Sequence, residues 1–150
     1  ILNSHGGNDF KPLLRELHGS TPVKIFLADW FRGTSADVKP EIFENPDDHA
    51  GEMETSLALA YFPHLVNRNA ETGALNADDG ATNSTRFSAV NAGWVSITRP
   101  WHLLTTNSGS GNPHQATAEK GEKLMQILVE RLSQFLVELS EAKLDDQFPF

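Results

Sequence analysis

Apolar residues recur at helical spacing in three segments of the chain, and each segment predicts an amphipathic helix. The first runs from Asp9 to Gly19, the second covers residues 51–66, and the third covers about residues 117–143. Pro63 is expected to end or bend the second helix, because proline lacks a backbone donor. The apolar stripe of the long third helix consists of Leu124, Leu128, Leu132, Phe135 and Leu139.

Runs of β-forming residues alternate with these helical segments. Residues 1–2 are typical of the end of a buried strand, residues 22–30 (PVKIFLADW) predict a second strand, and residues 94–98 predict a third. A strand, a helix and a strand in succession form a βαβ unit, which builds a parallel sheet. The whole order predicts an α/β fold, a three-layer α/β/α arrangement with a mostly parallel sheet.

Composition favours one globular domain and excludes several kinds of partner. The chain has 150 residues, 39% of them hydrophobic, which suits a single core. The formal net charge of −8 argues against nucleic acid, and no apolar run approaches the ~20 residues of a membrane span. Cysteine is absent, which excludes disulfides and thiolate metal sites and suits a reducing compartment. We therefore expect a cytoplasmic protein without nucleic-acid or membrane partners.

The first candidate for chemistry is His5, which directly follows the first predicted strand. In α/β proteins, ligands bind beyond the carboxyl ends of the strands. Gly6 and Gly7 permit a tight turn and a close backbone approach, and the helix that begins near Asp9 favours anions at its N-terminus. An imidazole at this place suits metal ligation or acid–base chemistry. Alternatively, His5 only fills a turn.

The second candidate is the segment DDHAGEMETS, residues 47–56, which is rich in titratable side chains. These are Asp47, Asp48, His49, Glu52 and Glu54. Carboxylates and imidazole together are ordinary ligands of Zn²⁺ or Mn²⁺. An acidic helix start would explain the carboxylates, but it does not explain His49. Within one regular helix His49 and Glu54 do not share a face, so both can act at one centre only if His49 precedes the helix.

Three segments of the chain resemble motifs of the creatininase (creatinine amidohydrolase) family. NSHGGN (residues 3–8) is similar to N-G-H-G-G-N, with Ser4 in place of a glycine, and HAGEMETS (residues 49–56) resembles H-A-G-x-x-E-T-S. GSGNPHQATAEKG (residues 109–121) is similar to G-x-x-G-[DN]-P-x-x-A-T-x-x-K-G. Order and spacing agree over most of the chain. Residues 1–150 would then form the C-terminal portion of a single creatininase-like domain.

The resemblance implies a metal-dependent amidohydrolase that cleaves a C–N bond of a small cyclic or linear amide with a metal-activated water. It implies two divalent ions in a complete site, Zn²⁺ or Mn²⁺ with Fe²⁺ as a further option, and a homo-oligomer, often a hexamer. By the same resemblance, His5 is a metal ligand, His49 assists proton transfer as a catalytic residue, and Glu54 lies at the metal centre or beside it. Gly6, Gly7 and Trp30 are expected at the substrate, although Trp30 is alternatively an ordinary core or rim residue.

Two differences from creatininase limit what the resemblance implies. Gly7 stands where creatininase carries a metal-binding carboxylate, so creatinine itself is not the expected substrate; relatives with the HGGN form are deformylases or peptide-trimming enzymes. The family's other Glu, His and Asp ligands belong to an N-terminal segment that precedes the part of the domain found here. Since the chain starts at Ile1 without a Met, we expect that missing N-terminal segment to be a necessary partner for activity.

Other hypotheses stay open beside this one. The domain is alternatively a non-catalytic binding or assembly module that retains the fold, or a deformylase-type relative. His114 lies in a Gly-rich loop whose backbone N–H groups can hold an anion, or it has no role. The polar loop 67–93, with Asp78 and Asp79, is expected either to cover a site or to join a subunit interface. Trp94 and Trp101 are expected in the core or an interface.

Overall fold

The computed structural model describes residues 1–45 and 49–150. The chain forms two compact units: unit 1 comprises Ile1–Pro40 and Leu124–Phe150, and unit 2 comprises Glu41–Lys123. Two of the candidate ligands, Asp47 and Asp48, lie outside the described residues. Within the described part of the chain, no helix is both long and apolar enough to cross a membrane.

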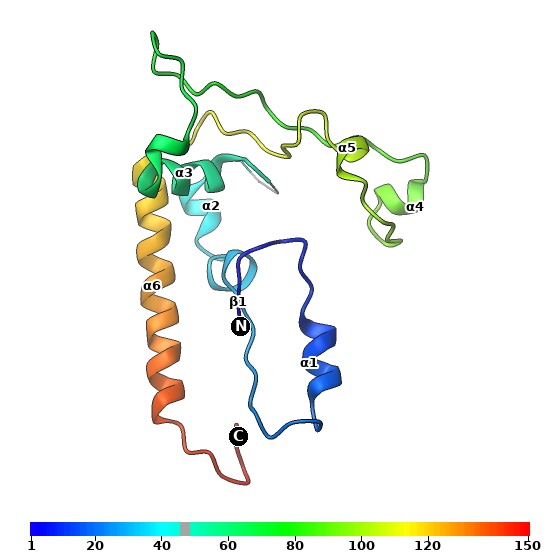
Figure 1. The fold of residues 1–150 in the computed structure, drawn as a ribbon, viewed down its shortest axis with the longest axis vertical. Coiled ribbons are helices and arrows are strands. Elements are labelled where there is room, and N and C mark those ends of the chain that lie inside the picture. Colours follow the sequence, from blue (N-terminus) through cyan, green and yellow to red (C-terminus); the bar gives the residue numbers. More distant parts are fainter. Residues whose placement is uncertain (46–48) are drawn as a thin grey trace. The chain divides into compact units, whose positions relative to one another are not determined.

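Unit 1 contains the predicted βαβ arrangement. β1 (Leu2–Asn3) and β2 (Ala28–Asp29) pair in parallel, with Asn3 opposite Asp29. The connection between them carries α1 (Lys11–Leu17), which runs back alongside the two strands (Figure 1). The chain leaves α1 through Gly19, whose φ of +85° favours glycine. The predictions of this helix and of the parallel pairing are confirmed.

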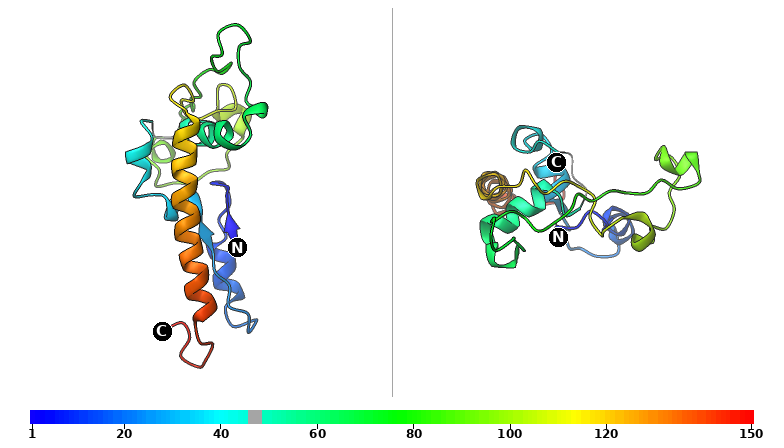
Figure 2. Two further views of the ribbon diagram at one scale, coloured as in Figure 1. Left: turned by 90° about the vertical axis from the view of Figure 1, so that its left-hand side faces the viewer. Right: turned by 90° about the horizontal axis from the view of Figure 1, so that it is seen from above.

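The helix α6 (Ala118–Glu141) also confirms its prediction. It begins in unit 2 and continues through unit 1, where its apolar stripe is buried at Leu124 and Leu128. Further along, Phe135 meets Phe26 of the segment before β2 with ring centroids 5.6 Å apart. This part of α6 runs beside the strands of unit 1 (Figure 2). Between β2 and α6 the chain forms a π-helical turn, η1 (Trp30–Thr34), and the short α2 (Lys39–Ile42).

The sheet of the described residues is smaller than predicted. It has two strands, and the predicted strand over residues 22–30 pairs only at residues 28–29. The predicted strand over residues 94–98 is wrong, because the segment forms no ladder and Trp94 is 76% exposed. β-forming side chains make a strand only where a neighbouring strand pairs with the backbone and a surface covers one face.

Unit 2 is built on α3 (Glu52–Tyr61), which ends before Pro63 as predicted and is followed by a 3₁₀ turn, η2 (Pro63–Leu65). Met53 is buried on this helix, whereas Tyr61 at its end is 46% exposed. The rest of the unit is mostly loop, with α4 (Ser88–Asn91) and α5 (Trp101–Leu104). The buried apolar residues are Ile42, Phe43, Met53 and Leu59.

Candidate functional site

His49 lies in the segment that precedes α3, the position that it needs in order to act together with Glu54. Its backbone pairs with Ser110: the His49 N–H donates to the Ser110 carbonyl at 3.0 Å, and the Ser110 N–H donates back at 2.8 Å. Glu54 Oε2 accepts the Ala50 N–H at 2.6 Å and lies 3.6 Å from His49 Nδ1. The structure thus brings together the predicted catalytic histidine and the predicted metal-centre carboxylate.

Trp101, which the sequence analysis expects in the core or an interface, lies against the His49 ring. The Trp101 ring meets the His49 ring edge to face, with centroids 5.4 Å apart and planes at 87°. Trp101 Nε1–H donates to the Ser108 carbonyl at 3.1 Å, and the Arg99 guanidinium lies 5.5 Å from the Trp101 ring centroid. Because Trp101 is far from His49 in sequence, no spacing pattern links the two residues.

A hollow of about 560 Å³ opens beside His49. Its polar lining includes Asn76, Asp78, Asn107 and Ser108. Asn107 Nδ2–H donates to the carbonyls of Asp78 and Asp79 at 3.3 and 3.2 Å, which ties the loop after η2 to the loop before α6. Part of the 67–93 loop therefore lines the hollow beside His49, while its expected role of covering a site or joining an interface stays a prediction.

Close backbone contact between these two loops depends on glycine. A Cβ atom on Gly80 would lie 2.2 Å from the carbonyl carbon of Gly109, far inside van der Waals contact. Nearby, Asp79 Oδ1 lies 3.4 Å from His114 Nε2, and Asp79 Oδ2 accepts Asn112 Nδ2–H at 3.5 Å. The His114 ring thus has a carboxylate neighbour, while the anion site expected at the backbone N–H groups of this loop stays a prediction.

Glu52 differs from Glu54 although the two residues belong to one motif. Its side chain is 0% exposed. Oε2 accepts the backbone N–H groups of Glu44 and Asn45 at 3.0 and 2.9 Å and the Asn45 side-chain amide at 3.0 Å. Oε1 accepts Lys120 Nζ at 2.5 Å. Glu52 therefore braces the segments before and after the site instead of facing it.

The charge states of Glu52 and Lys120 follow from the hydrogen bonds that these side chains make. Burial alone would raise the pKa of Glu52, but the hydrogen bonds from Lys120 and Asn45 outweigh it and hold that pKa below its usual value. The hydrogen bond to Glu52 in turn raises the pKa of Lys120. Lys120 Nζ also donates to the Gln115 carbonyl at 3.0 Å and to Glu44 Oε1 at 3.2 Å. Both partners are thus ionised at neutral pH.

The third motif packs directly on α3 through its last residues. The Thr117 N–H donates to Ser56 Oγ at 3.2 Å, and Ser56 is 0% exposed. A Cβ on Gly121 would lie 2.2 Å from the Ser56 carbonyl oxygen, so glycine lets the start of α6 touch α3. The second and third sequence motifs therefore form one packed arrangement within unit 2.

The His5 loop lies at the end of β1 in unit 1, and the buried Asn3 organises it. Asn3 Nδ2–H donates to Asp29 Oδ1 at 2.5 Å and to the His5 carbonyl at 3.2 Å. Asn3 Oδ1 accepts the His5 N–H and Asn8 Nδ2–H, each at 3.2 Å. A 3% exposed amide with every group partnered fixes the backbone of the loop. The sequence reasoning used Asn3 as part of a motif but assigned it no role.

The His5 ring is exposed, and its Nδ1 accepts the Gly7 N–H at 2.9 Å. A Cβ on Gly7 would lie 3.1 Å from His5 Cε1, whereas one on Gly6 would meet nothing closer than 3.6 Å. Gly6 also receives Arg32 Nη2–H on its carbonyl at 2.7 Å. Trp30, which directly follows β2, is half-buried with its ring 5.9 Å from that of Phe31.

Imidazole and carboxylate are suitable donors for Zn²⁺ or Mn²⁺. In the described parts of the chain, however, no three His, Asp or Glu side chains lie close enough to hold a metal ion. His5 belongs to unit 1 and the His49–Glu54 pair to unit 2. The donor types thus fit a catalytic metal, while the described residues of either unit bring together fewer than the usual three protein ligands.

Comparisons with known proteins bear on the whole of this arrangement. The family model described as creatininase, creatinine amidohydrolase, matches residues 1–136. No protein of curated function matches. A crystal structure from Bacteroides fragilis NCTC 9343, provisionally assigned as a creatinine amidohydrolase, is similar with 37% identity and a TM-score of 0.80, and the match covers 97% of this chain. This chain spans 55% of the length of that protein. It has a creatininase-like fold and belongs to the creatininase family, which confirms the resemblance of the three motifs.

Proposed function

We propose that this chain contributes to a divalent-metal-dependent amidohydrolase that cleaves a C–N bond of a small cyclic or linear amide. The observation that carries the proposal is the His49–Glu54 pair, held by the second and third motifs at the edge of a hollow. Family membership supports the reaction class. The three-layer sheet, the homo-oligomer and the use of two ions belong to the same proposal and concern the longer protein.

In this proposal His49 moves the proton and Glu54 positions the ring. The amine that leaves a cleaved amide must gain a proton, and a histidine is the usual donor near neutral pH. Glu54 Oε2 lies at ion-pair distance from His49 Nδ1, and Trp101 covers the ring edge to face. The opposite ring nitrogen, Nε2, is then the atom that meets the substrate. The polar walls of the hollow bind the amide.

A divalent metal, when bound, polarises the amide carbonyl and supplies hydroxide near neutral pH. His5 is the metal ligand that we propose in unit 1, and metal binding must change its hydrogen bond. Coordination by Nδ1 displaces the Gly7 N–H, which that atom now accepts. Coordination by Nε2 of a neutral ring leaves the proton on Nδ1, which then cannot accept. Either route breaks the His5–Gly7 bond, so ligation has a readout of its own.

The proposal is tested on the complete natural polypeptide by metal analysis and amide hydrolysis. His5→Ala should remove most of the bound metal and the activity, while His18→Ala, an exposed histidine of the same unit, should change neither. His49→Gln should keep the metal and lose turnover, by about 10²–10⁴-fold for a general acid. Unchanged metal content in His5→Ala rejects the ligand assignment.

Two alternative functions of the same fold, a deformylase and a non-catalytic binding module, can be distinguished by the substrates that the protein hydrolyses. Cyclic amides, linear amides and N-formyl compounds are offered as a panel. Hydrolysis of formamides alone would identify the protein as a deformylase-type relative. That outcome agrees with Gly7, which stands where creatininase carries a metal-binding carboxylate. Stoichiometric metal without turnover of any amide would instead favour a non-catalytic binding module, and would contradict the enzyme proposal.

A further inference from the structure

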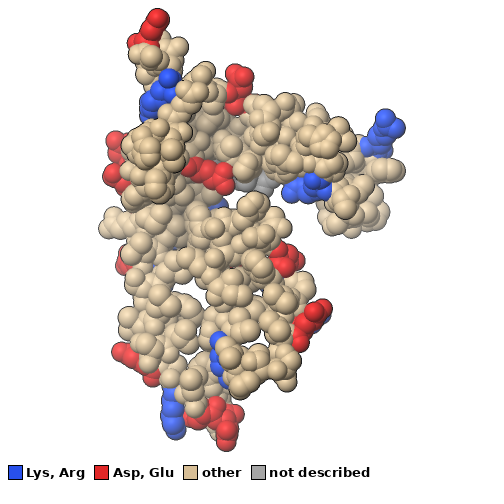
Figure 3. All heavy atoms as spheres, in the orientation of Figure 1, with Lys and Arg blue, Asp and Glu red and all other residues tan. Residues whose placement is uncertain are grey.

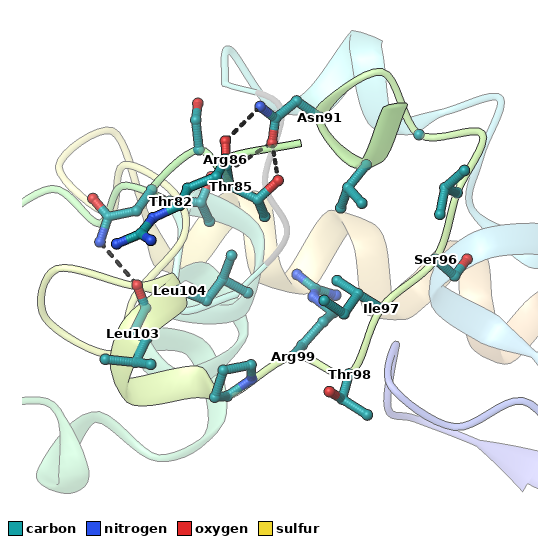
Figure 4. A pocket seen from close by; sticks show the side chains of 16 residues that line it. Thr82, Thr85, Arg86, Asn91, Ser96, Ile97, Thr98, Arg99, Leu103 and Leu104 are labelled. Carbon is teal, nitrogen blue, oxygen red and sulfur yellow. Dashed lines mark hydrogen bonds between the residues drawn. The ribbon is translucent and has the colours of Figure 1, made fainter. Parts of the chain in front are cut away.

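Two asparagine side chains each hold a loop of this chain, and they differ in how they are anchored. In unit 2, Asn91 Oδ1 accepts the N–H and the hydroxyl of Thr85, each at 2.8 Å, and Asn91 Nδ2–H donates to the Thr85 carbonyl at 2.9 Å (Figure 4). These bonds are exposed and join Asn91 to one residue. In unit 1, the buried Asn3 instead joins β2 to the His5 loop.

The anchor of Asn3 is Asp29, at the end of β2. Asp29 is half-buried and lies opposite Asn3 in the parallel pair of strands. Its Oδ1 accepts Asn3 Nδ2–H at 2.5 Å. In the view of Figure 3, acidic side chains over α1 and the C-terminal half of α6 stand at separate points of the surface. The Asp29 carboxylate, in contrast, is directed at a buried amide.

This contact fixes which end of the Asn3 amide faces β2. An ionised carboxylate accepts hydrogen bonds and donates none, so the amide nitrogen must lie at Asp29. The amide oxygen then points at the loop, where it accepts the His5 N–H and Asn8 Nδ2–H, each at 3.2 Å. A reversed amide would place oxygen against oxygen at Asp29 and N–H against N–H at the loop. Asp29 therefore selects one orientation of Asn3.

Both backbone groups of His5 depend on that orientation. The His5 N–H donates to Asn3 Oδ1, and the His5 carbonyl accepts Asn3 Nδ2–H at 3.2 Å and the Asn8 N–H at 3.1 Å. The direction in which the imidazole leaves the chain follows from the backbone that carries it. Groups that orient a metal ligand from behind are worth about 10–100-fold in metal affinity.

We propose that Asp29 is a positioning residue for His5, which it holds through the amide of Asn3. The inference rests on His5 as the metal ligand of the proposed amidohydrolase, but the hold on the loop can be measured without metal. Because Trp30 directly follows Asp29, the same carboxylate joins the segment that carries Trp30 to the loop that carries His5.

The hold on the loop is measured first, by amide hydrogen exchange in the metal-free, complete natural polypeptide. In Asp29→Ala the Asn3 amide can reverse, so the His5 N–H should exchange at least about fivefold faster, as expected for the loss of one hydrogen bond. Asp29→Asn keeps an acceptor oxygen and should restore most of the protection. Circular dichroism checks that each variant is folded.

A comparison within the unchanged protein does not depend on the folding of any variant. The side-chain amide protons of Asn3, which is 3% exposed, should exchange at least about tenfold more slowly than those of the exposed Asn91. Equal exchange rates of the two side chains would overturn the proposal.

The consequence for His5 is measured by Zn²⁺ titration of the same proteins. Asp29→Ala should lower the Zn²⁺ affinity by at least about tenfold, and Asp29→Asn by less than about threefold. Asp9→Ala is the matched control, because Asp9 lies in the same loop but its side chain accepts only the Lys11 N–H, at 3.3 Å, among the described residues. This control removes the same charge and should leave both His5 exchange and Zn²⁺ affinity near their original values.

The outcomes separate this inference from the proposed function. Unchanged His5 exchange in a folded Asp29→Ala variant overturns the inference, and so does unchanged Zn²⁺ affinity. Equal losses of affinity in Asp29→Ala and Asp9→Ala would assign the loss to charge alone and overturn it as well. Full metal content in His5→Ala would reject the ligand assignment, whereas faster His5 exchange in Asp29→Ala would still support Asp29 as the anchor of the loop.

Discussion

The loop around His5 and the segment around His49 carry the two histidines of the candidate site, and the chain holds them differently. His49 is fixed by residues distant in sequence, with Ser110 on its backbone and Trp101 on its ring, and by Glu54 at Nδ1. The His5 backbone is fixed by the buried Asn3, but its ring is exposed and bonds only to the neighbouring Gly7 N–H among the described residues.

This difference separates a pre-organised residue from one that can still change partners. Long-range contacts around His49 order its ring before any substrate arrives, which is what positioning in catalysis requires. The single local hydrogen bond of His5 can be broken at a small cost in free energy, so the ring can rotate and bind a metal ion.

The largest expected effect is at Glu52, which braces the His49 segment. Glu52→Gln removes one partner of a buried ion pair and leaves Lys120 without its main partner. The free energy of unfolding should fall by about 3 kcal/mol, as measured by urea denaturation.

Glu54→Gln is the matched control, since Glu54 belongs to the same helix but its side chain is 45% exposed. Its loss should stay below about 1 kcal/mol. Equal losses in the two variants would contradict the assignment of Glu52 as the brace. Because the pKa of Glu52 is lowered in the folded state, its contribution is present above the pKa of the unfolded chain and is lost as the pH falls through the folded value.

The contact between α3 and the start of α6 should be nearly as sensitive. Gly121→Ala places a Cβ atom 2.2 Å from the Ser56 carbonyl oxygen, and backbone cannot give way as a side chain can. We expect a loss of about 2–3 kcal/mol from overpacking. Gly33→Ala, where a Cβ would meet nothing within 4 Å, should change stability by less than about 1 kcal/mol. A tolerated Gly121→Ala would show that this helix contact is looser than described.

At the His5 loop the expected effect is on metal affinity instead of stability. Gly7→Ala brings a methyl group 3.1 Å from His5 Cε1 and displaces the ring. Metal affinity of the complete polypeptide should fall by about tenfold, the low end of what disturbing a ligand's surroundings costs. Gly6→Ala is the control, because its closest contact is an ordinary 3.6 Å. Identical metal affinities in the two variants would argue against His5 as the ligand.

The smallest effect concerns an exposed ion pair of unit 1, the counterpart of the buried pair in unit 2. Arg131 donates to both carboxylate oxygens of Asp37, at 2.6 and 2.8 Å, and its hydrogen bond lowers the pKa of Asp37 to about 2. The stability that this pair adds is present above the unfolded pKa of ~3.9 and is lost as the pH falls toward about 2.

Carboxyl NMR titration of Asp37 measures this directly. Arg131→Gln should return the pKa of Asp37 to near its ordinary value of 3.8. An unchanged pKa in that variant would assign the shift to the backbone around Asp37 and not to the guanidinium.

Elements with a strong local pattern could be predicted from the sequence. The apolar stripe of α6 and the βαβ order of unit 1 were both correct, because helical spacing and parallel connections are encoded within short stretches. The strand expected over residues 94–98 was wrong, since its formation depends on a neighbouring strand that no local pattern reveals.

The candidate site was predictable only in part for the same reason. His49 and Glu54 follow from one short motif and from the geometry of a helix start. The roles of Trp101 and Glu52 depend on contacts with Ser108 and Lys120, which lie on other segments. A carboxylate at a helix start has the same sequence signature whether it braces a loop or faces a hollow.

In the proposed enzyme, His5 becomes a metal ligand by giving up its hydrogen bond to the Gly7 N–H. The most direct test is to titrate Zn²⁺ into the complete, isotopically labelled polypeptide and to follow the His5 ring nitrogens and the Gly7 amide proton. Both sets of signals should change together at stoichiometric metal. A fully metal-loaded protein in which the His5 nitrogens and the Gly7 amide keep their metal-free shifts would contradict it.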